Sequence, residues 1–259
     1  MEGLFAGLDV STQSCKLVVI DLRAREVVHV DAVEYDADLP HYGTRAGTIE
    51  GLGPGVSESD PRMWTEAVEL LLERLKQAPE VAQDHIRCLS VSGQQHGLVA
   101  LAADGSLAYP RSKLWNDFST AEECDLLTER VGGVERMLAQ VGNTQRTGYT
   151  APKILHMLRH EPECYARATT LFLVHNYVNW HLTGGARGGV AVMEPGDTSG
   201  TALWNPVTRA WSTTVLEAID PGLEQKLPPV RPSDQTIGSI APELAAKFGL
   251  STECRIGAG

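Results

Sequence analysis

The chain has 259 residues, a length that suits one large domain or two modest ones. Its net charge of −11 argues against a nucleic-acid partner, whose phosphates it would repel. No run of about 18 apolar residues occurs and the N-terminus lacks a signal-peptide pattern, so the sequence predicts no membrane partner. Five scattered cysteines without a CxxC pair favour free thiols in a reducing cytoplasm.

The first forty residues predict a β-meander. Residues 3–10 are a mainly apolar run, a polar turn follows at 11–14, and residues 15–21 form a second apolar run, which together indicate a β-hairpin. Alternation over residues 27–35 predicts a third strand beside it.

A loop and a well-capped helix come next. Residues 39–60 are rich in Gly, Pro, Ser and Thr, which favours a loop. Asp60 and Pro61 then provide an N-cap and a first helical residue, and apolar residues at helical spacing continue to about residue 78. Strands are expected at 86–92 and 98–102.

Beyond Asp117 the pattern becomes mainly helical, with residues 201–204 expected to be short and extended. The sequence predicts helices at about 119–131, 133–140, 151–160, 171–183, 212–218 and 240–249. A strand meander, a helix, a further strand and a helical block predict an α/β fold.

The first motif with chemical potential is the turn after the first strand. Asp9 closes that strand, and the hydroxyl-rich segment Ser11-Thr12-Gln13-Ser14 follows. Such a turn presents backbone N–H groups and hydroxyls to an anion, and a carboxylate beside it can hold hydrated Mg²⁺. The competing interpretation is a plain hairpin turn, because Ser and Asp favour turns for local reasons.

Two further motifs could bind a sugar. Gln95 and His96 lie between glycines at a strand end, and amide and imidazole groups suit hydroxyls. Trp115, Asn116 and Asp117 could stack on a sugar face and bind its hydroxyls, or they could pack in the core and cap the next helix.

Other known signatures are absent. No GxSxG, HExxH, GxGxxG or Walker A motif occurs. His156 and His160 share a helix face, but no further ligands are evident in the sequence, so we expect them to be structural or exposed. The segment 195–201, which is rich in small and polar residues, alone indicates only a loop.

In order and spacing, these segments resemble the FGGY carbohydrate kinases of the actin–hexokinase superfamily. The resemblance covers nearly the whole chain, from residues 7–16 through 90–97, 114–117 and 150–153 to 197–201. The Gln-His-Gly and Trp-Asn-Asp segments are most similar to those of xylulokinases.

The resemblance implies roles for particular residues. Asp9 would lie near Mg²⁺ and the ATP phosphates, and the phosphate loop would be lined by Thr12, Gln13, Ser14 and Lys16. The sugar would contact Gln95 and His96, and its pocket would be shaped by Trp115, Asn116 and Asp117, with Gln145 and Arg146 as a further contact region.

It also implies a ribonuclease-H-like mixed sheet with helices on both faces and a mainly helical insertion at about 118–190. Residues 1–259 would form the N-terminal domain of a cytoplasmic, ATP- and Mg²⁺-dependent sugar kinase, whose second, ATP-binding domain lies outside this chain. The expected reaction is phosphorylation of D-xylulose at O5, or of another ketose or polyol; a non-catalytic sugar-binding domain is the remaining alternative. A homodimer stays open.

The sequence departs from the family pattern in three places. Ser11 and Ser14 stand where many relatives have glycine, and His175-Asn176 stands where many have Lys-Asp. In the family, a Gly-Asp-Asn signature follows a glycine-rich run such as the one ending at Gly259, and its Asp is the expected general base. No such Asp is included in residues 1–259. We therefore expect residues 1–259 alone to be inactive.

Overall fold

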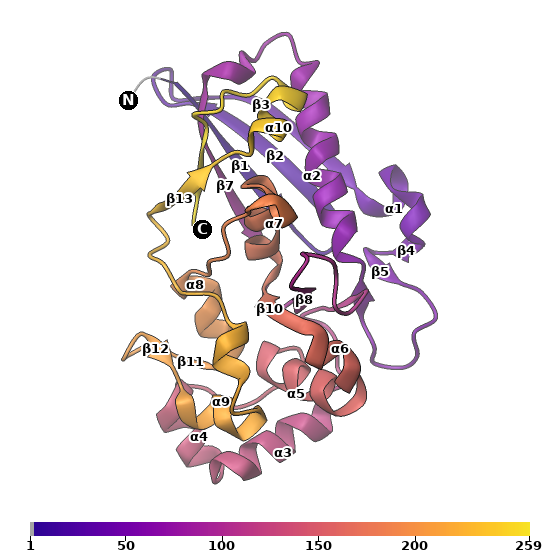
Figure 1. The fold of residues 1–259 in the computed structure, drawn as a ribbon. Helices are drawn as coiled ribbons and strands as arrows, with labels where there is room; N and C mark the ends of the chain where they lie inside the picture. Colours follow the sequence, from indigo (N-terminus) through magenta and orange to yellow (C-terminus); the bar gives the residue numbers. More distant parts are fainter. Residues whose placement is uncertain (1–2) are drawn as a thin grey trace.

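A computed structural model describes residues 3–259. Its centre is a six-stranded mixed sheet in the order β13-β14-β7-β1-β2-β3 (Figure 1). The strands are β1 (Leu4–Val10), β2 (Ser14–Asp21), β3 (Glu26–Glu34), β7 (Ile86–Gly93), β13 (Thr236–Ser239) and β14 (Arg255–Gly257). The mixed sheet and α/β class confirm the predicted fold class.

The predicted meander is present. β1 pairs antiparallel with β2, with Asp9 opposite Lys16, and β2 pairs antiparallel with β3. β7 lies parallel to β1 on its other side, with Ser92 as the register partner of Asp9. Because β1 and β7 are parallel, their carboxyl ends meet at one edge of the sheet, where α/β proteins commonly bind ligands.

Helices pack on one face of the sheet. This face carries buried residues such as Leu8, Leu17 and Val91, which share one core with α2 (Pro61–Lys76), α7 (Val174–Leu182) and α10 (Pro242–Phe248). The opposite face carries exposed residues, including Asp9 and Lys16. Helices on both faces were expected, whereas in residues 3–259 these three helices contact the sheet from one side only.

The predicted α2 begins as expected. The Asp60 side chain accepts a hydrogen bond from the Arg62 N–H, and Pro61 is the first helical residue. The preceding segment is more ordered than the predicted loop, because it forms short elements that pair among themselves and with β9. These are α1 (Tyr35–Asp38), η1 (Pro40–Tyr42), β4 (Thr44–Arg45), β5 (Thr48–Ile49), β6 (Glu58–Ser59) and β9 (Ser112–Lys113).

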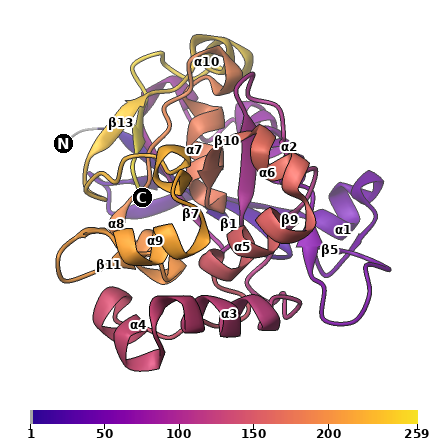
Figure 2. The same cartoon turned by 60° about the horizontal axis from the view of Figure 1, so that its bottom comes forward.

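A second hydrophobic core lies below the sheet in Figure 1, and Figure 2 shows α3 and α4 along its outer edge. Its elements are β8 (Val99–Ala102), α3 (Ala121–Val131), α4 (Val134–Val141), α5 (Thr150–His160), α6 (Pro162–Arg167), β10 (Ala168–Phe172), α9 (Thr213–Ile219) and η5 (Leu223–Lys226). The core extends to both sides of the expected insertion at 118–190, and α7 within that range packs on the sheet instead.

Several boundaries differ from prediction. The helix expected at 171–183 begins at Val174, because residues 168–172 pair with β8 as strand β10. Residues 201–204 are only partly extended: Thr201 ends the 3-10 turn η4 (Ser199–Thr201), and β11 (Trp204–Asn205) pairs with β12 (Ala210–Trp211). The remaining short elements are η2 (Gln83–His85), η3 (Gly185–Arg187) and α8 (Pro195–Thr198). Among residues 3–259, no helix is both long and apolar enough to cross a membrane.

Candidate functional site

Two adjoining hollows lie at the carboxyl ends of β1 and β7, and Gln95 lines both. The first encloses about 430 Å³ and is lined by Ser11, Thr12, Gln94, Gln95, His96, Trp115, Thr147 and Tyr149. The second encloses about 230 Å³ and is lined by Val91, Ser92, Gly93, Gln95, His175, Glu194, Asp197 and Gly259. The two hollows bring together residues far apart in sequence.

The turn after β1 is held firmly from behind. The Ser11 N–H bonds to the Ser14 carbonyl at 3.0 Å, and the Ser11 carbonyl accepts from the buried Tyr35 hydroxyl at 3.1 Å. The Gln94 N–H binds the Val10 carbonyl at 2.9 Å, which ties the ends of the two parallel strands together. A turn fixed in this way is preorganised to present its outer polar groups.

Asp9 suits a hydrated cation. Its carboxylate is exposed, and both oxygens accept the Ser11 hydroxyl at 2.9 Å, so a neutral hydroxyl is its hydrogen-bond partner. Lys16 is its exposed cross-strand neighbour. An accessible carboxylate with only a hydroxyl on it fits Mg²⁺, which binds one or two carboxylates and keeps several waters.

Three further residues predicted to line the phosphate loop differ in exposure and direction. Gln13 is exposed at the tip of the turn, while Ser14 is buried as the first residue of β2, opposite Glu34. The prediction that Ser14 lines the loop therefore places it on the wrong side: it supports the turn from within the sheet. Thr12 differs from both because it faces the first hollow.

Thr12 links the turn to the sugar-pocket candidates. Its hydroxyl accepts a hydrogen bond from the Trp115 indole N–H at 2.9 Å and donates to the Gln94 side-chain carbonyl at 3.3 Å. The Trp115 side chain is 50% exposed, so an aromatic face remains available to a ligand while its N–H is occupied. This is the arrangement expected of a sugar-stacking tryptophan.

His96 lies in a strained conformation and is held from below. Its φ of 64° is in the left-handed region, and its carbonyl accepts the buried Lys153 ammonium at 2.6 Å. Lys153 also binds the Gly148 carbonyl at 2.5 Å. The left-handed backbone costs about 1–3 kcal/mol and persists only where surroundings enforce it, and here Lys153 joins the strained turn to the 147–149 segment.

The His96 imidazole faces the hollow as a neutral group. Burial, followed by the charge of Lys153, lowers its pKa to about 4, against an opposing effect of Asp197. Its ring packs against Tyr149 with centroids 4.7 Å apart, and its buried Nδ1 has no hydrogen-bond partner among residues 3–259. A neutral, unpartnered imidazole can give or accept a hydrogen bond with a sugar hydroxyl.

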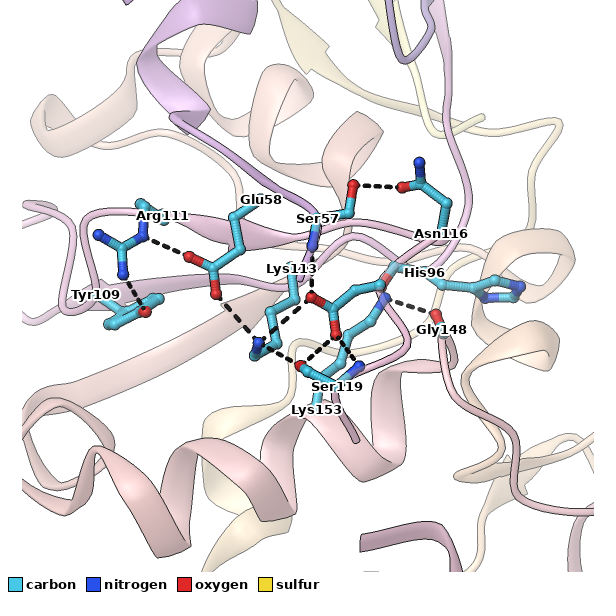
Figure 3. A network of polar contacts seen from close by, with 11 residues as sticks. Ser57, Glu58, His96, Tyr109, Arg111, Lys113, Asn116, Ser119, Gly148 and Lys153 are labelled. Carbon is cyan, nitrogen blue, oxygen red and sulfur yellow. Dashed lines mark hydrogen bonds and ion pairs between the residues drawn. The ribbon is translucent and has the colours of Figure 1, made fainter. Parts of the chain in front are cut away.

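Asp117 was predicted to shape the sugar pocket; in the structure it lines neither hollow and lies buried beside them. The carboxylate is fully buried and accepts from the Ser57 N–H at 2.9 Å, from Ser119 at 2.6 and 3.0 Å, and from Lys113 at 3.4 Å. Figure 3 shows this network beneath the loop that carries Asn116. Asp117 therefore has no free oxygen to offer a substrate.

The same network extends sideways. Lys113 also binds Glu58 at 3.1 Å, and Glu58 is bonded by Arg111, while Asn116 accepts the Ser57 hydroxyl at 2.8 Å (Figure 3). Neither Asn116 nor Asp117 lines the two hollows. Trp115 is the member of this motif that does.

Gln145 and Arg146 are also displaced from the pocket. Gln145 is buried, and its amide donates to the Ala202 carbonyl at 3.3 Å, whereas Arg146 is exposed. From this segment, the residues that line the first hollow are Thr147 and Tyr149, which follow Arg146 in the chain. The prediction found the segment and missed the residues, because side-chain direction in an irregular segment is set by tertiary contacts.

The second hollow contains a polar cluster that includes Asp197, from the segment 195–201 whose sequence alone indicates only a loop. His175 Nδ1 lies 3.0 Å from Asp197 Oδ2, and His175 Nε2 lies 2.8 Å from the Asn176 amide nitrogen. Asp197 Oδ1 is buried without a partner among residues 3–259, so it can receive a ligand hydroxyl. His175 departs from the family pattern, and it pairs here with Asp197.

Glu194 fixes Asp197 in position. It caps α8 by accepting from the N–H groups of Gly196 and Asp197 at 2.6 Å each, and it accepts the Ser233 hydroxyl at 2.7 Å. Burial opposes its ionisation, but these hydrogen bonds and the nearby His175 outweigh burial and lower its pKa. The pattern Glu-Pro-Gly-Asp, with an acid before an N-terminal Pro, is a capping signal that could have revealed this helix start.

Comparisons with known proteins agree with this geometry. Residues 4–259 match the model of the FGGY family of carbohydrate kinases, N-terminal domain, and the chain belongs to that family. The xylulose kinase of Streptomyces coelicolor is 33% identical over 258 residues, covering 99% of this chain and 48% of the relative. The xylulose kinase of Haemophilus influenzae is 30% identical over 262 residues, covering 99% and 50%. The chain thus spans about half the length of these relatives.

Solved structures show the same fold. A xyloylose kinase from Brucella ovis superimposes with a TM-score of 0.83 at 27% identity, covering 99% of this chain and 48% of that one. A xylulose kinase from Lactobacillus acidophilus superimposes with a TM-score of 0.84 at 22% identity, covering 99% and 47%. The ribonuclease-H-like fold implied by the sequence resemblance is confirmed.

Proposed function

We propose that the protein containing this chain phosphorylates D-xylulose at O5 with ATP, and that residues 1–259 supply the sugar pocket and the phosphate turn. The observation that carries the proposal is the first hollow, in which Trp115, His96 and Gln95 meet Thr12 of the turn after β1. An aromatic face, a neutral imidazole and an amide are groups that bind a small polyhydroxylated molecule. The likeness to xylulose kinases supports the choice of sugar.

In this proposal the chain acts by positioning. Phosphoryl transfer depends mainly on alignment and on stabilising charge, so the pocket serves to hold one sugar hydroxyl toward the phosphate turn. Asp9 would hold Mg²⁺, which would neutralise charge on the ATP phosphates. Lys16, opposite Asp9, would add a positive charge beside the phosphates.

The proposed general base lies outside residues 1–259. By resemblance to the family, we expect it directly after a glycine-rich run like that ending at Gly259. The Gly259 backbone lines the second hollow, as does Asp197. Ser90 donates to the Gly259 carbonyl at 2.8 Å and Asn179 donates to the Ala258 carbonyl at 3.1 Å, which fixes this segment. A residue that follows Gly259 would therefore lie next to the second hollow.

The test is sugar-dependent ADP release by the full-length protein on a panel of D-xylulose, D-ribulose, glycerol and a tetritol. We expect the highest kcat/KM with D-xylulose, and no turnover by residues 1–259 alone. A higher kcat/KM on another member would support the alternative ketose or polyol kinase. Sugar binding without turnover by the full-length protein would support a non-catalytic sugar-binding role.

A further inference from the structure

Three side chains with metal-ligating atoms meet on the helical block, away from both hollows. Glu123 lies on α3, and His156 and His160 lie on α5. One ligand atom of each residue can be chosen so that all three lie within 4.8 Å of one another. The spacing of four residues places both imidazoles on one face of α5, with ring centroids 4.4 Å apart.

Glu123 gives the cluster a buried carboxylate. Its side chain is 1% exposed, its Oε1 lies 3.1 Å from His160 Nε2, and the same oxygen accepts Arg159 Nη1 at 2.5 Å. The hydrogen bonds described for this carboxylate in residues 3–259 all reach Oε1, so Oε2 remains for another partner. A buried carboxylate is a fixed ligand, because its side chain has already lost its rotamer freedom.

Arg159 does not have to block the site. Its second nitrogen, Nη2, binds Glu122 at 2.5 Å, and the Glu122 side chain is 71% exposed. Arg159 therefore keeps a carboxylate partner when a cation shares Glu123. The guanidinium bridges Glu122 and Glu123, and it reaches Glu123 through Oε1.

His156 is the residue that a purely structural role does not explain. The bond from His160 to Glu123 already joins α5 to α3, but His156 makes no hydrogen bond or ion pair among the described residues. A half-buried imidazole without a hydrogen-bond partner, beside a second imidazole and a carboxylate, is a potential ligand set.

We propose that Glu123, His156 and His160 form a site for a divalent transition-metal ion of the Zn²⁺ type. Two imidazoles and one carboxylate are a ligand set that Zn²⁺ uses, with its fourth position left to water. Nitrogen ligands disfavour Mg²⁺, which prefers oxygen, so this site is distinct from the Asp9 region. Occupancy would cross-link α3 to α5, the helix that also carries Lys153.

The test is titration of the chelator-treated protein with Zn²⁺ by calorimetry, without sugar or ATP. We expect one saturable site whose affinity falls at least tenfold in both His156→Ala and His160→Ala. The matched control is His41→Ala, because His41 is an exposed histidine that pairs with a single carboxylate, Glu66, at 3.1 Å. The control should bind Zn²⁺ as the parent does.

Co²⁺ provides a second measurement that survives a change in stability. Bound Co²⁺ should give visible d–d absorption that disappears in Glu123→Gln, whose fold is checked by circular dichroism, and excess Mg²⁺ should not displace it. Zn²⁺ affinity that is absent, or that is unchanged in both histidine variants, would overturn the proposal. Neither result depends on kinase activity, so the two proposals fail independently.

Discussion

Lys153 offers a direct test of how the first hollow is supported. Its side-chain nitrogen is fully buried between the carbonyls of His96 and Gly148, at 2.6 and 2.5 Å. Burial lowers its pKa from 10.5 to about 7; Lys113 adds to this effect and Asp117 opposes it. A neutral amine has two N–H groups, which match the two carbonyls, so the uncharged form satisfies this site.

The sign of the pH dependence follows from proton counting. Between pH 7 and 10.5 the unfolded chain holds the lysine proton while the folded chain has largely released it, so stability rises with pH in this window. From about pH 7.5 to about pH 9.5, the gain from this one group is about 2.5 kcal/mol. Well below pH 7 both states are protonated, and this group no longer makes stability change with pH.

Lys153→Met should remove that gain. We expect the free energy of unfolding of the parent, minus that of the variant, to rise by about 2.5 kcal/mol from about pH 7.5 to about pH 9.5 in urea titrations. Lys76→Met is the control, because Lys76 also donates to a backbone carbonyl, at 2.8 Å, but at the surface. The control should keep the pH response of the parent. A parent-to-variant difference in unfolding free energy that is equal at both pH values would refute the assignment of a buried neutral amine.

Three further substitutions probe the site. Asp117→Ala leaves the buried partners of this carboxylate without their acceptor and should lower the free energy of unfolding, measured in urea, by about 3–5 kcal/mol. Asp125→Ala, at an exposed position, should change the free energy of unfolding by no more than about 0.5 kcal/mol. Gly200→Ala places a Cβ 2.6 Å from the imidazole of the first hollow and should raise the sugar KM of the full-length protein; Gly238→Ala, whose nearest atoms lie at 3.7 Å, should not. Trp115→Phe keeps an aromatic face but loses a hydrogen bond of about 0.5–1.5 kcal/mol to the phosphate turn, so the KM for ATP should rise roughly two- to tenfold. An unchanged KM for ATP in Trp115→Phe would contradict the idea that this hydrogen bond couples the first hollow to the turn after β1.

Sequence patterns predicted the elements whose stability is local. The hairpin of β1 and β2 and the capped start of α2 follow from apolar runs, turn residues and an Asp-Pro cap, all short-range signals. β13 and β14 were not predicted, because they are short and depend on pairing with each other and with β7. β10 was merged into a helix because its partner, β8, is distant in sequence.

The candidate site divides in the same way. Asp9, Gln95 and His96 were identified at or beside strand ends. The structure brings them to one edge of the sheet, because β1 and β7 are parallel and their carboxyl ends meet there. The directions of side chains on irregular segments were not predicted, since Asp117 and Gln145 point into the core. Whether such a residue faces a ligand or a buried lysine depends on tertiary contacts that no local pattern encodes.

If the protein has the proposed kinase activity, the shared hydroxyl of Thr12 has a consequence for changing its sugar preference. Trp115 and Gln94 both hydrogen-bond to this one hydroxyl. A substitution of Trp115 made to change the sugar preference would therefore also disturb the turn after β1. Thr147 and Tyr149 line the same hollow from a segment that does not bond to the turn. Variation at these two positions can reshape the pocket while the turn stays intact, so they are where evolution or redesign has the most freedom.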